Sequence, residues 1–129
     1  KYEEILKKIN NLNELSYRVT QNGDTERPFS GKYDSFYKHG KYACICCGKI
    51  LFNSDDKFDS GSGWPSFKKP VNDNVLDLIE DLSFSMVRTE VKCKCGSHLG
   101  HVFDDGPSPT FKRFCINSAS LNFKENNEL

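Results

Sequence analysis

Near the start of the chain, apolar residues recur every three or four positions and charged residues fill the gaps. Five residues follow this spacing: Ile5, Leu6, Ile9, Leu12 and Leu15. They lie on one face if residues 1–15 are helical. The pattern therefore predicts one amphipathic helix, with a second helical turn near residues 12–19.

From Gly31 onward the pattern changes to short aromatic or β-branched runs, separated by Gly, Pro, Asp and Ser at intervals of roughly 8–12 residues. The runs cover residues 42–46, 50–52, 75–78, 84–91, 101–103 and 111–123. This rhythm is typical of an antiparallel all-β sandwich or barrel. We expect a single domain over residues 1–129, with a helical arm at 1–20 and a frayed polar tail at 124–129.

Charge and hydropathy exclude several classes of protein. Lys and Arg number 18, as do Asp and Glu, so the long-range basic field that favours nucleic-acid binding is missing. No apolar run is long enough for a membrane helix, and no signal-peptide pattern opens the chain. The chain starts with Lys1 rather than Met, which is consistent with removal of an N-terminal leader. We expect an intracellular protein, cytoplasmic or organellar, that binds neither nucleic acid nor membrane.

Five of the six cysteines fall in two tight clusters, and each cluster ends in Cys-Gly. Cys44 and Cys47 form the first pair, and Cys93 and Cys95 form the second. A cysteine pair closed by Gly is the pattern of a zinc knuckle, because Gly lets the backbone turn its N–H groups toward the thiolates. Two knuckles predict a structural Cys₄ zinc site.

Other interpretations of these cysteines stay open. Six cysteines could form disulfides or remain free thiols, and His98 or His101 could replace one thiolate in a metal site. Cys46, between two expected ligands, could be a small apolar filler, a substitute ligand or a redox partner for another thiol.

The sixth cysteine, Cys115, stands alone in K-R-F-C-I-N-S. In a strand, Phe114 would face the core, whereas Arg113, Cys115 and Asn117 would share the opposite face. An adjacent Arg favours the reactive thiolate, and Asn can position a polar substrate atom. The alternative is an inert cysteine beside an exposed Arg.

Two further segments favour a reactive thiol. The segment G-S-H-L-G-H-V-F-D-D-G-P at 96–107 carries His98 and His101, which can bind metal, support ligands or donate protons near neutral pH. The segment G-S-G-W-P-S-F at 61–67 places Trp64 in a loop, where it could form the wall of a small apolar pocket. A thiolate, a proton donor and an aromatic wall together suggest attack on a small, weakly polar substrate.

The sequence resembles the methionine-R-sulfoxide reductase B family. The matching segments follow the family's order from about residue 15 to 123. They are T-E-R-P-F-S-G (25–31), Y-A-C-I-C-C-G-K-I-L-F (42–52), D-S-G-S-G-W-P-S-F (59–67), R-T-E-V (88–91), C-G-S-H-L-G-H-V-F-D-D-G-P (95–107) and R-F-C-I-N-S-A-S-L (113–121). The last two segments are highly specific.

The resemblance implies two small antiparallel sheets, as a sandwich or open barrel, with short N-terminal helices and a structural Cys₄ zinc. It implies that Cys115 attacks the sulfur of methionine-R-sulfoxide and becomes a sulfenic acid, with thioredoxin or another thiol as the reductant. By position, Trp64 would hold the methyl group, and His98 and His101 would bind and protonate the oxygen. Asp105, Arg113 and Asn117 would orient these groups and tune the thiolate.

The sequence departs from the family pattern in two places. Ser62 stands where many members carry the resolving cysteine, and only Lys94 separates the two cysteines of the second knuckle. The first departure leaves recycling to an external thiol or to Cys46. The second leaves open whether Cys46 assists the metal site.

A binding module of the kind used by guanine-nucleotide-exchange chaperones is the rival class, since such scaffolds also carry two knuckles. An adaptor does not need Arg, Cys and Asn on one strand face, so the sequence favours the enzyme. A zinc-dependent hydrolase is disfavoured, because four thiolates leave no open metal position. We expect a monomer that acts on free or protein-bound methionine-R-sulfoxide.

Overall fold

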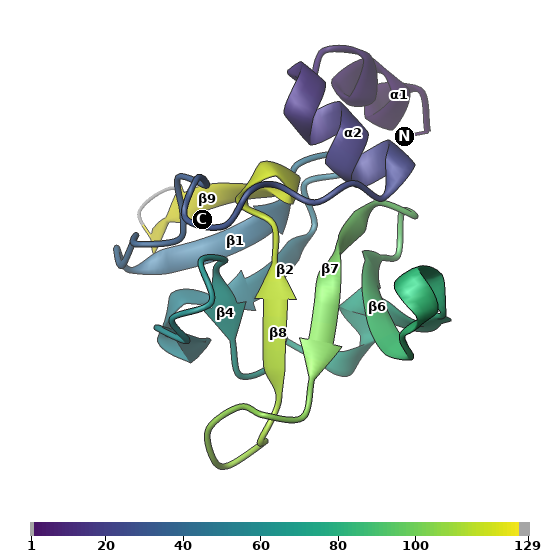
Figure 1. Cartoon of the computed structure of the whole chain (residues 1–129). Helices are drawn as coiled ribbons and strands as arrows, with labels where there is room; N and C mark the ends of the chain where they lie inside the picture. Colours follow the sequence, from purple (N-terminus) through teal and green to yellow (C-terminus); the bar gives the residue numbers. More distant parts are fainter. Residues whose placement is uncertain (1, 127–129) are drawn as a thin grey trace.

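The structure is a computed structural model, and it describes residues 2–126. Two short helices lie at one end of a mainly β molecule (Figure 1). They are α1 (Tyr2–Asn10) and α2 (Glu14–Asn22). Neither they nor any other helix of the described part is long and apolar enough to cross a membrane.

The helix predicted over residues 1–15 ends earlier, at Asn10, and the second helical turn predicted near residues 12–19 is the separate helix α2. Helix α2 begins after Asn13, whose side-chain Oδ1 accepts a hydrogen bond from the Ser16 N–H at 2.8 Å. A side chain that satisfies a free N–H in this way stabilises a helix start. Apolar spacing continues through Leu12 and Leu15, so the periodicity alone conceals the break.

Within residues 2–126, nine strands form two antiparallel sheets, which confirms the predicted fold class. A three-stranded sheet has the order β2-β1-β9, and a six-stranded sheet has the order β3-β4-β8-β7-β6-β5. The strands are β1 (Gly40–Cys44), β2 (Ile50–Asn53), β3 (Lys57–Phe58), β4 (Ser66–Phe67), β5 (Leu76–Asp81), β6 (Arg88–Cys93), β7 (His98–Phe103), β8 (Arg113–Ile116) and β9 (Leu121–Glu125).

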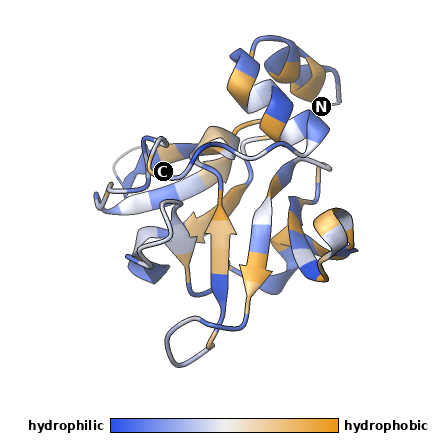
Figure 2. Cartoon of the chain, viewed as in Figure 1, coloured by the Kyte–Doolittle hydropathy of each residue, from blue (hydrophilic) through white to orange (hydrophobic). Residues whose placement is uncertain are grey.

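Aromatic side chains fill the space between the two sheets. Phe52 of β2 stacks on Phe67 of β4, with ring centroids 4.4 Å apart, and Tyr42 of β1 meets Phe67 edge-on at 5.1 Å. These rings are fully buried, and burial of such large apolar surfaces is the main stabilising contribution in a core. In Figure 2, β8 is hydrophobic along most of its length.

Two of the expected strands differ in the structure. Residues 83–85 form a 3-10 turn before β6, and Phe84 has a φ of 58° and is 81% exposed. The run at 111–123 is divided by a second 3-10 turn, η4 (Ser118–Ser120), into β8 and β9. An apolar run does not distinguish a strand from an exposed turn, because both tolerate Phe and Met.

The C-terminal segment departs from the expected frayed tail. Lys124 and Glu125 pair with Lys41 and Gly40 of β1, so β9 continues beyond residue 123. Residues 127–129, the remainder of the expected tail, lie outside the described residues.

Candidate active site and metal centre

Cys115 lies on β8, which occupies the centre of the six-stranded sheet between β4 and β7 (Figure 1). Its Cα is paired with Ser66 on one side and with His101 on the other. A cavity of about 250 Å³ opens above it. The lining residues are Thr25, Ser62, Trp64, Arg88, Gly100, His101, Phe103, Arg113, Cys115 and Asn117.

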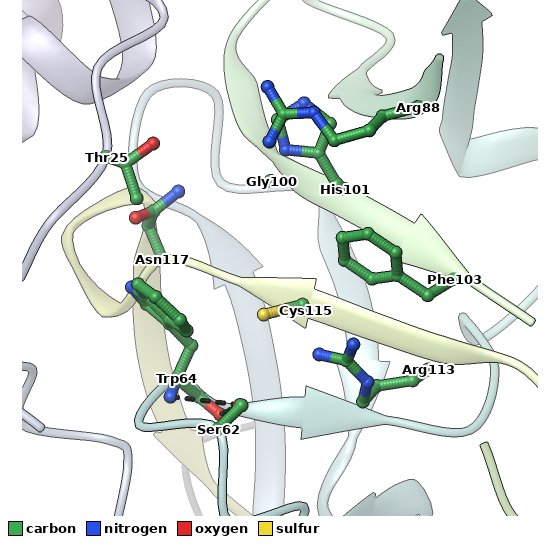
Figure 3. Close-up of a pocket in the computed structure, with 10 residues that line it drawn as sticks. All are labelled: Thr25, Ser62, Trp64, Arg88, Gly100, His101, Phe103, Arg113, Cys115 and Asn117. Carbon is green, nitrogen blue, oxygen red and sulfur yellow. Dashed lines mark hydrogen bonds between the residues drawn. The ribbon is translucent and has the colours of Figure 1, made fainter. Parts of the chain in front are cut away.

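The strand alternation predicted for β8 is confirmed. Phe114 and Ile116 are buried in the core, whereas Arg113 and Cys115 line the cavity on the other face. Figure 3 shows the Cys115 sulfur pointing into the space bordered by Trp64 and Ser62.

Burial raises the pKa of the Cys115 thiol above its ordinary value, because a buried thiolate loses its hydration. The Arg113 charge opposes this shift most strongly, and hydrogen bonds from Ser62 and Arg113 act in the same direction. The sequence therefore predicted the sign of the Arg113 effect, but burial of the thiol outweighs it. On balance the surroundings favour the thiol over the thiolate, and Arg113 offsets part of the effect of burial.

Arg113 is held in place from two sides. Its Nε and a terminal nitrogen donate to the two carboxylate oxygens of Asp105 at 2.9 and 3.1 Å. Its guanidinium also stacks on Phe103, 4.5 Å from the ring centroid. A bidentate carboxylate contact fixes the plane of a guanidinium, so Asp105 orients Arg113. Asp105 itself does not line the Cys115 cavity.

Asn117 follows β8 directly and is buried. Its side-chain Nδ2 donates to the Leu99 carbonyl at 2.9 Å, and its Oδ1 accepts from the backbone N–H of Glu26 at 2.9 Å. Both polar ends of the amide are therefore bound to backbone, and Asn117 joins β7 to the segment that follows α2.

The two histidines occupy different positions. His101 lines the Cys115 cavity, whereas His98 is 4% exposed and lines an adjoining cavity of about 400 Å³ that also contains His101. The resemblance assigns both histidines to the sulfoxide oxygen, but only His101 lines the Cys115 cavity. The ring centroids of His98 and His101 are 5.6 Å apart, and the two rings meet edge to face.

Each histidine is paired with a carboxylate that sequence reasoning missed. His98 Nδ1 lies 2.6 Å from Glu90 Oε2, and His101 Nε2 lies 2.8 Å from Asp81 Oδ2. Burial lowers the pKa of His98, and Glu90 partly opposes this. The pairs form because β5, β6 and β7 are neighbours, and only the sheet register reveals this.

Trp64 and Ser62 form the opposite wall of the cavity (Figure 3). The Trp64 indole N–H donates to the Glu26 carbonyl at 3.0 Å. The Ser62 hydroxyl lies 2.8 Å from the hydroxyl of Ser60, which is itself 2.7 Å from that of Ser66. A chain of three hydroxyls therefore ends beside Cys115.

The second constellation is the thiol cluster, formed by Cys44, Cys47, Cys93 and Cys95. All four sulfurs lie within 4.8 Å of one another. Sulfur–sulfur distances of 3.7 Å for Cys44–Cys95 and 3.5 Å for Cys47–Cys93 are close to the roughly 3.8 Å edge of a tetrahedron with metal–sulfur bonds of about 2.3 Å. The predicted grouping is confirmed, and the short second knuckle does not prevent it.

Both knuckles turn at a glycine, as the sequence predicted. Gly48 and Gly96 have φ values of 80° and 97°, which side-chain-bearing residues rarely adopt. One knuckle follows β1 of the small sheet and the other connects β6 to β7 of the large sheet. The thiol cluster therefore joins the two sheets.

Cys46 is buried and is not one of the four clustered thiols. Its sulfur lies 3.6 Å from Nε2 of Gln21 in α2. Cys46 packs within the buried hydrophobic core and does not line the Cys115 cavity.

Comparison with known proteins connects this arrangement to a family. The family model described as the SelR domain matches residues 12–125. A peptide methionine sulfoxide reductase MsrB of Synechococcus sp. (strain RCC307) is 57% identical over 110 residues, which cover 84% of this chain and 81% of the relative. The chain belongs to the MsrB family.

Other MsrB relatives agree with this assignment. Proteins of the same name from Acinetobacter baumannii (strain AYE) and Hahella chejuensis are each 54% identical, over 88% and 87% of this chain and 82% and 81% of their own lengths. The match at 12–125 contains the cavity around Cys115 and all four clustered thiols. The MsrB domain thus includes both constellations.

Proposed function

We propose that this protein reduces methionine-R-sulfoxide, free or in proteins, to methionine, as a peptide-methionine (R)-S-oxide reductase. The observation that supports this best is the juxtaposition of a cysteine, a guanidinium, a histidine and an indole in one small cavity. The MsrB relatives are named peptide methionine sulfoxide reductases, which supports this reaction class.

Cys115 is the proposed nucleophile. Its thiolate attacks the sulfoxide sulfur, the oxygen is transferred to the cysteine sulfur with a proton, and methionine leaves. The cysteine is then a sulfenic acid, the first and reversible product of thiol oxidation. Arg113 supports the step by stabilising the thiolate, because the thiolate and not the thiol is the nucleophile.

Opposite walls of the cavity are proposed to bind different groups of the substrate. Trp64 offers an apolar face for the methyl group, and His101 lies on the opposite side, where it can donate to the sulfoxide oxygen (Figure 3). The oxygen gains charge as the sulfur is attacked, so a donor held there acts most strongly in the transition state. Asp81 holds the ring of His101, and His98 supports it from behind.

The sulfenic acid must be reduced by thiols. Two external thiol groups restore the Cys115 thiol, forming one disulfide and one water. Ser62 borders the thiol where a resolving cysteine stands in many members, and Cys46 is buried in the core against α2. We therefore propose direct reduction by an external thiol such as thioredoxin, glutaredoxin-coupled glutathione or dithiothreitol.

Zinc is the metal that fits the thiol cluster best. Four thiolates in a tetrahedron are the usual ligands of structural zinc, and the sulfur spacing matches that geometry. Four thiols this close cannot all ionise without a cation between them. The ion would hold the two sheets together and would take no part in the reaction at Cys115.

An assay of both sulfoxide epimers with dithiothreitol and with thioredoxin tests the activity. We expect reduction of the R epimer alone, since the S epimer would place its oxygen against Trp64 and leave donors unpaired, at a cost of about 1–3 kcal/mol or more. Cys115→Ser should abolish turnover, because a hydroxyl cannot form a sulfenic acid. Comparable rates on both epimers, or turnover by Cys115→Ser above a few per cent, would contradict the proposal.

A further inference from the structure

The segment after α2 carries the T-E-R-P-F-S-G motif, whose role the reaction does not explain. Glu26, in this motif, is only 2% exposed. Its backbone binds two residues that line the cavity: its N–H donates to Asn117 Oδ1 at 2.9 Å, and its carbonyl accepts from the Trp64 indole N–H at 3.0 Å. One residue outside the cavity therefore positions two residues that line it.

The side chain of Glu26 explains how that backbone is held. Its Oε1 accepts a hydrogen bond from the backbone N–H of Ala119 in η4 at 2.9 Å. The chain then returns over the carboxylate at Gly31, where a Cβ would lie 2.3 Å from both Glu26 Oε2 and the Ser118 hydroxyl. The chain at Gly31 therefore packs closely against the carboxylate, where a side chain with a Cβ would collide with it.

Burying this carboxylate is unfavourable. Oε2 has no hydrogen-bond partner among the described residues, and burial raises the pKa of Glu26, with the Ala119 N–H offsetting part of the effect. An apolar side chain would avoid that cost but could not accept the Ala119 N–H. The carboxyl group therefore contributes position rather than stability.

We propose that Glu26 is a positioning residue, which anchors the segment at 25–27 to η4 and thereby fixes Trp64 and Asn117 at the walls of the substrate cavity. This inference rests on the proposed reductase function, and it assigns a role within it to a residue that does not touch the cavity. Glu26 acts on substrate binding through the indole, so its loss should affect KM more than kcat.

Trp64 is the only tryptophan of the chain, so intrinsic fluorescence reports on this wall without any activity measurement. In Glu26→Ala, we expect a red shift of the emission maximum, stronger quenching by acrylamide, and a KM for N-acetyl-methionine-R-sulfoxide about tenfold higher, equivalent to one lost hydrogen bond. Glu26→Gln keeps an oxygen acceptor of the same length and should restore the emission and most of the KM.

Val19→Ala is the matched control, because Val19 is a buried core residue of α2 that lines none of the cavities described. It should lower the urea midpoint while leaving emission and KM near the wild type. If Glu26→Ala fails to fold, Glu26→Asp replaces it, since its carboxylate is one methylene shorter and should show the same changes to a smaller degree.

Unchanged emission and KM in a folded Glu26→Ala or Glu26→Asp variant would overturn the inference, as would Glu26→Gln losing as much as Glu26→Ala. An inactive wild type would instead refute the proposed function, and the fluorescence series would still decide whether Glu26 positions Trp64. The two failures are therefore distinguishable.

Discussion

Gly100 determines how closely β7 approaches the strand that carries Cys115. A Cβ added at this position would lie 2.0 Å from the Cys115 carbonyl oxygen and 3.0 Å from the Ile116 Cα. Both are backbone atoms inside a sheet, so neither can rotate away. The strands would have to separate until this 2.0 Å distance reached the 3.4 Å of an ordinary contact, which conflicts with the close packing of a protein interior.

We expect Gly100→Ala to destabilise the protein by about 2–4 kcal/mol, in the upper range for overpacking, because the clash falls on backbone. With a urea m-value of about 1–3 kcal/mol/M, the unfolding midpoint should fall by roughly 1–2 M. Equilibrium urea unfolding followed by Trp64 fluorescence measures this directly. The same variant should expose Cys115 to Ellman's reagent faster than wild type.

Gly23→Ala is the control for Gly100→Ala. Gly23, which ends α2, has a φ of 72° but no atom within 4 Å of an added Cβ, so the change should cost about 1 kcal/mol from the backbone alone. If Gly100→Ala unfolds at the same urea concentration as Gly23→Ala or higher, the close approach of β7 to Cys115 is not what stabilises this part of the sheet.

Three further predictions concern the thiols. Alkylation of Cys115 by iodoacetamide should accelerate as pH rises through and above the ordinary thiol range, because burial raises the pKa of Cys115. At pH 8 the Arg113→Gln variant should react about tenfold more slowly than wild type. Equal alkylation rates would contradict the role of Arg113. One equivalent of methionine-R-sulfoxide without reductant should consume one thiol per chain in wild type and two in Ser62→Cys. Dimedone should label Cys115 in wild type only. Loss of two thiols in wild type, with Cys115 linked to Cys46, would identify Cys46 as the resolving residue. Elemental analysis should find one zinc per chain, and Cys47→Ser should lose it together with several kcal/mol of stability; a stable metal-free variant would exclude a structural ion.

The fold was predictable where local chemistry determines it. The Cys-Gly turns require a left-handed residue at a fixed place, so the sequence predicted the knuckles, and the alternation in Phe114–Ile116 predicted which face of β8 meets the cavity. The exposed turn around Phe84 was not predictable, because its apolar residues resemble a strand. The second helical turn near residues 12–19 was predicted, but the position of the break before α2 was not, because apolar spacing continues across it.

The partners within the site depend on register, which a single sequence does not contain. Glu90 faces His101 across β6 and β7, yet it pairs with His98, and Asp81 reaches His101 from β5. The sequence signal was only that two acidic residues, Asp81 and Glu90, lie within 20 residues of His98 and His101. Glu26 gave even less, because its contacts with Asn117 and Ala119 span 91 and 93 residues of sequence.

The thiol cluster has a consequence for the order in which the molecule assembles. Its sulfur contacts join residues 46 and 51 positions apart, and bringing such distant points together has an entropic cost that must be met before an ion can bind all four ligands. Neither sheet alone offers more than two thiols. With the proposed ion, four-thiol coordination requires both sheets to have docked, so the fraction of chains with a fully coordinated ion would report on that docking.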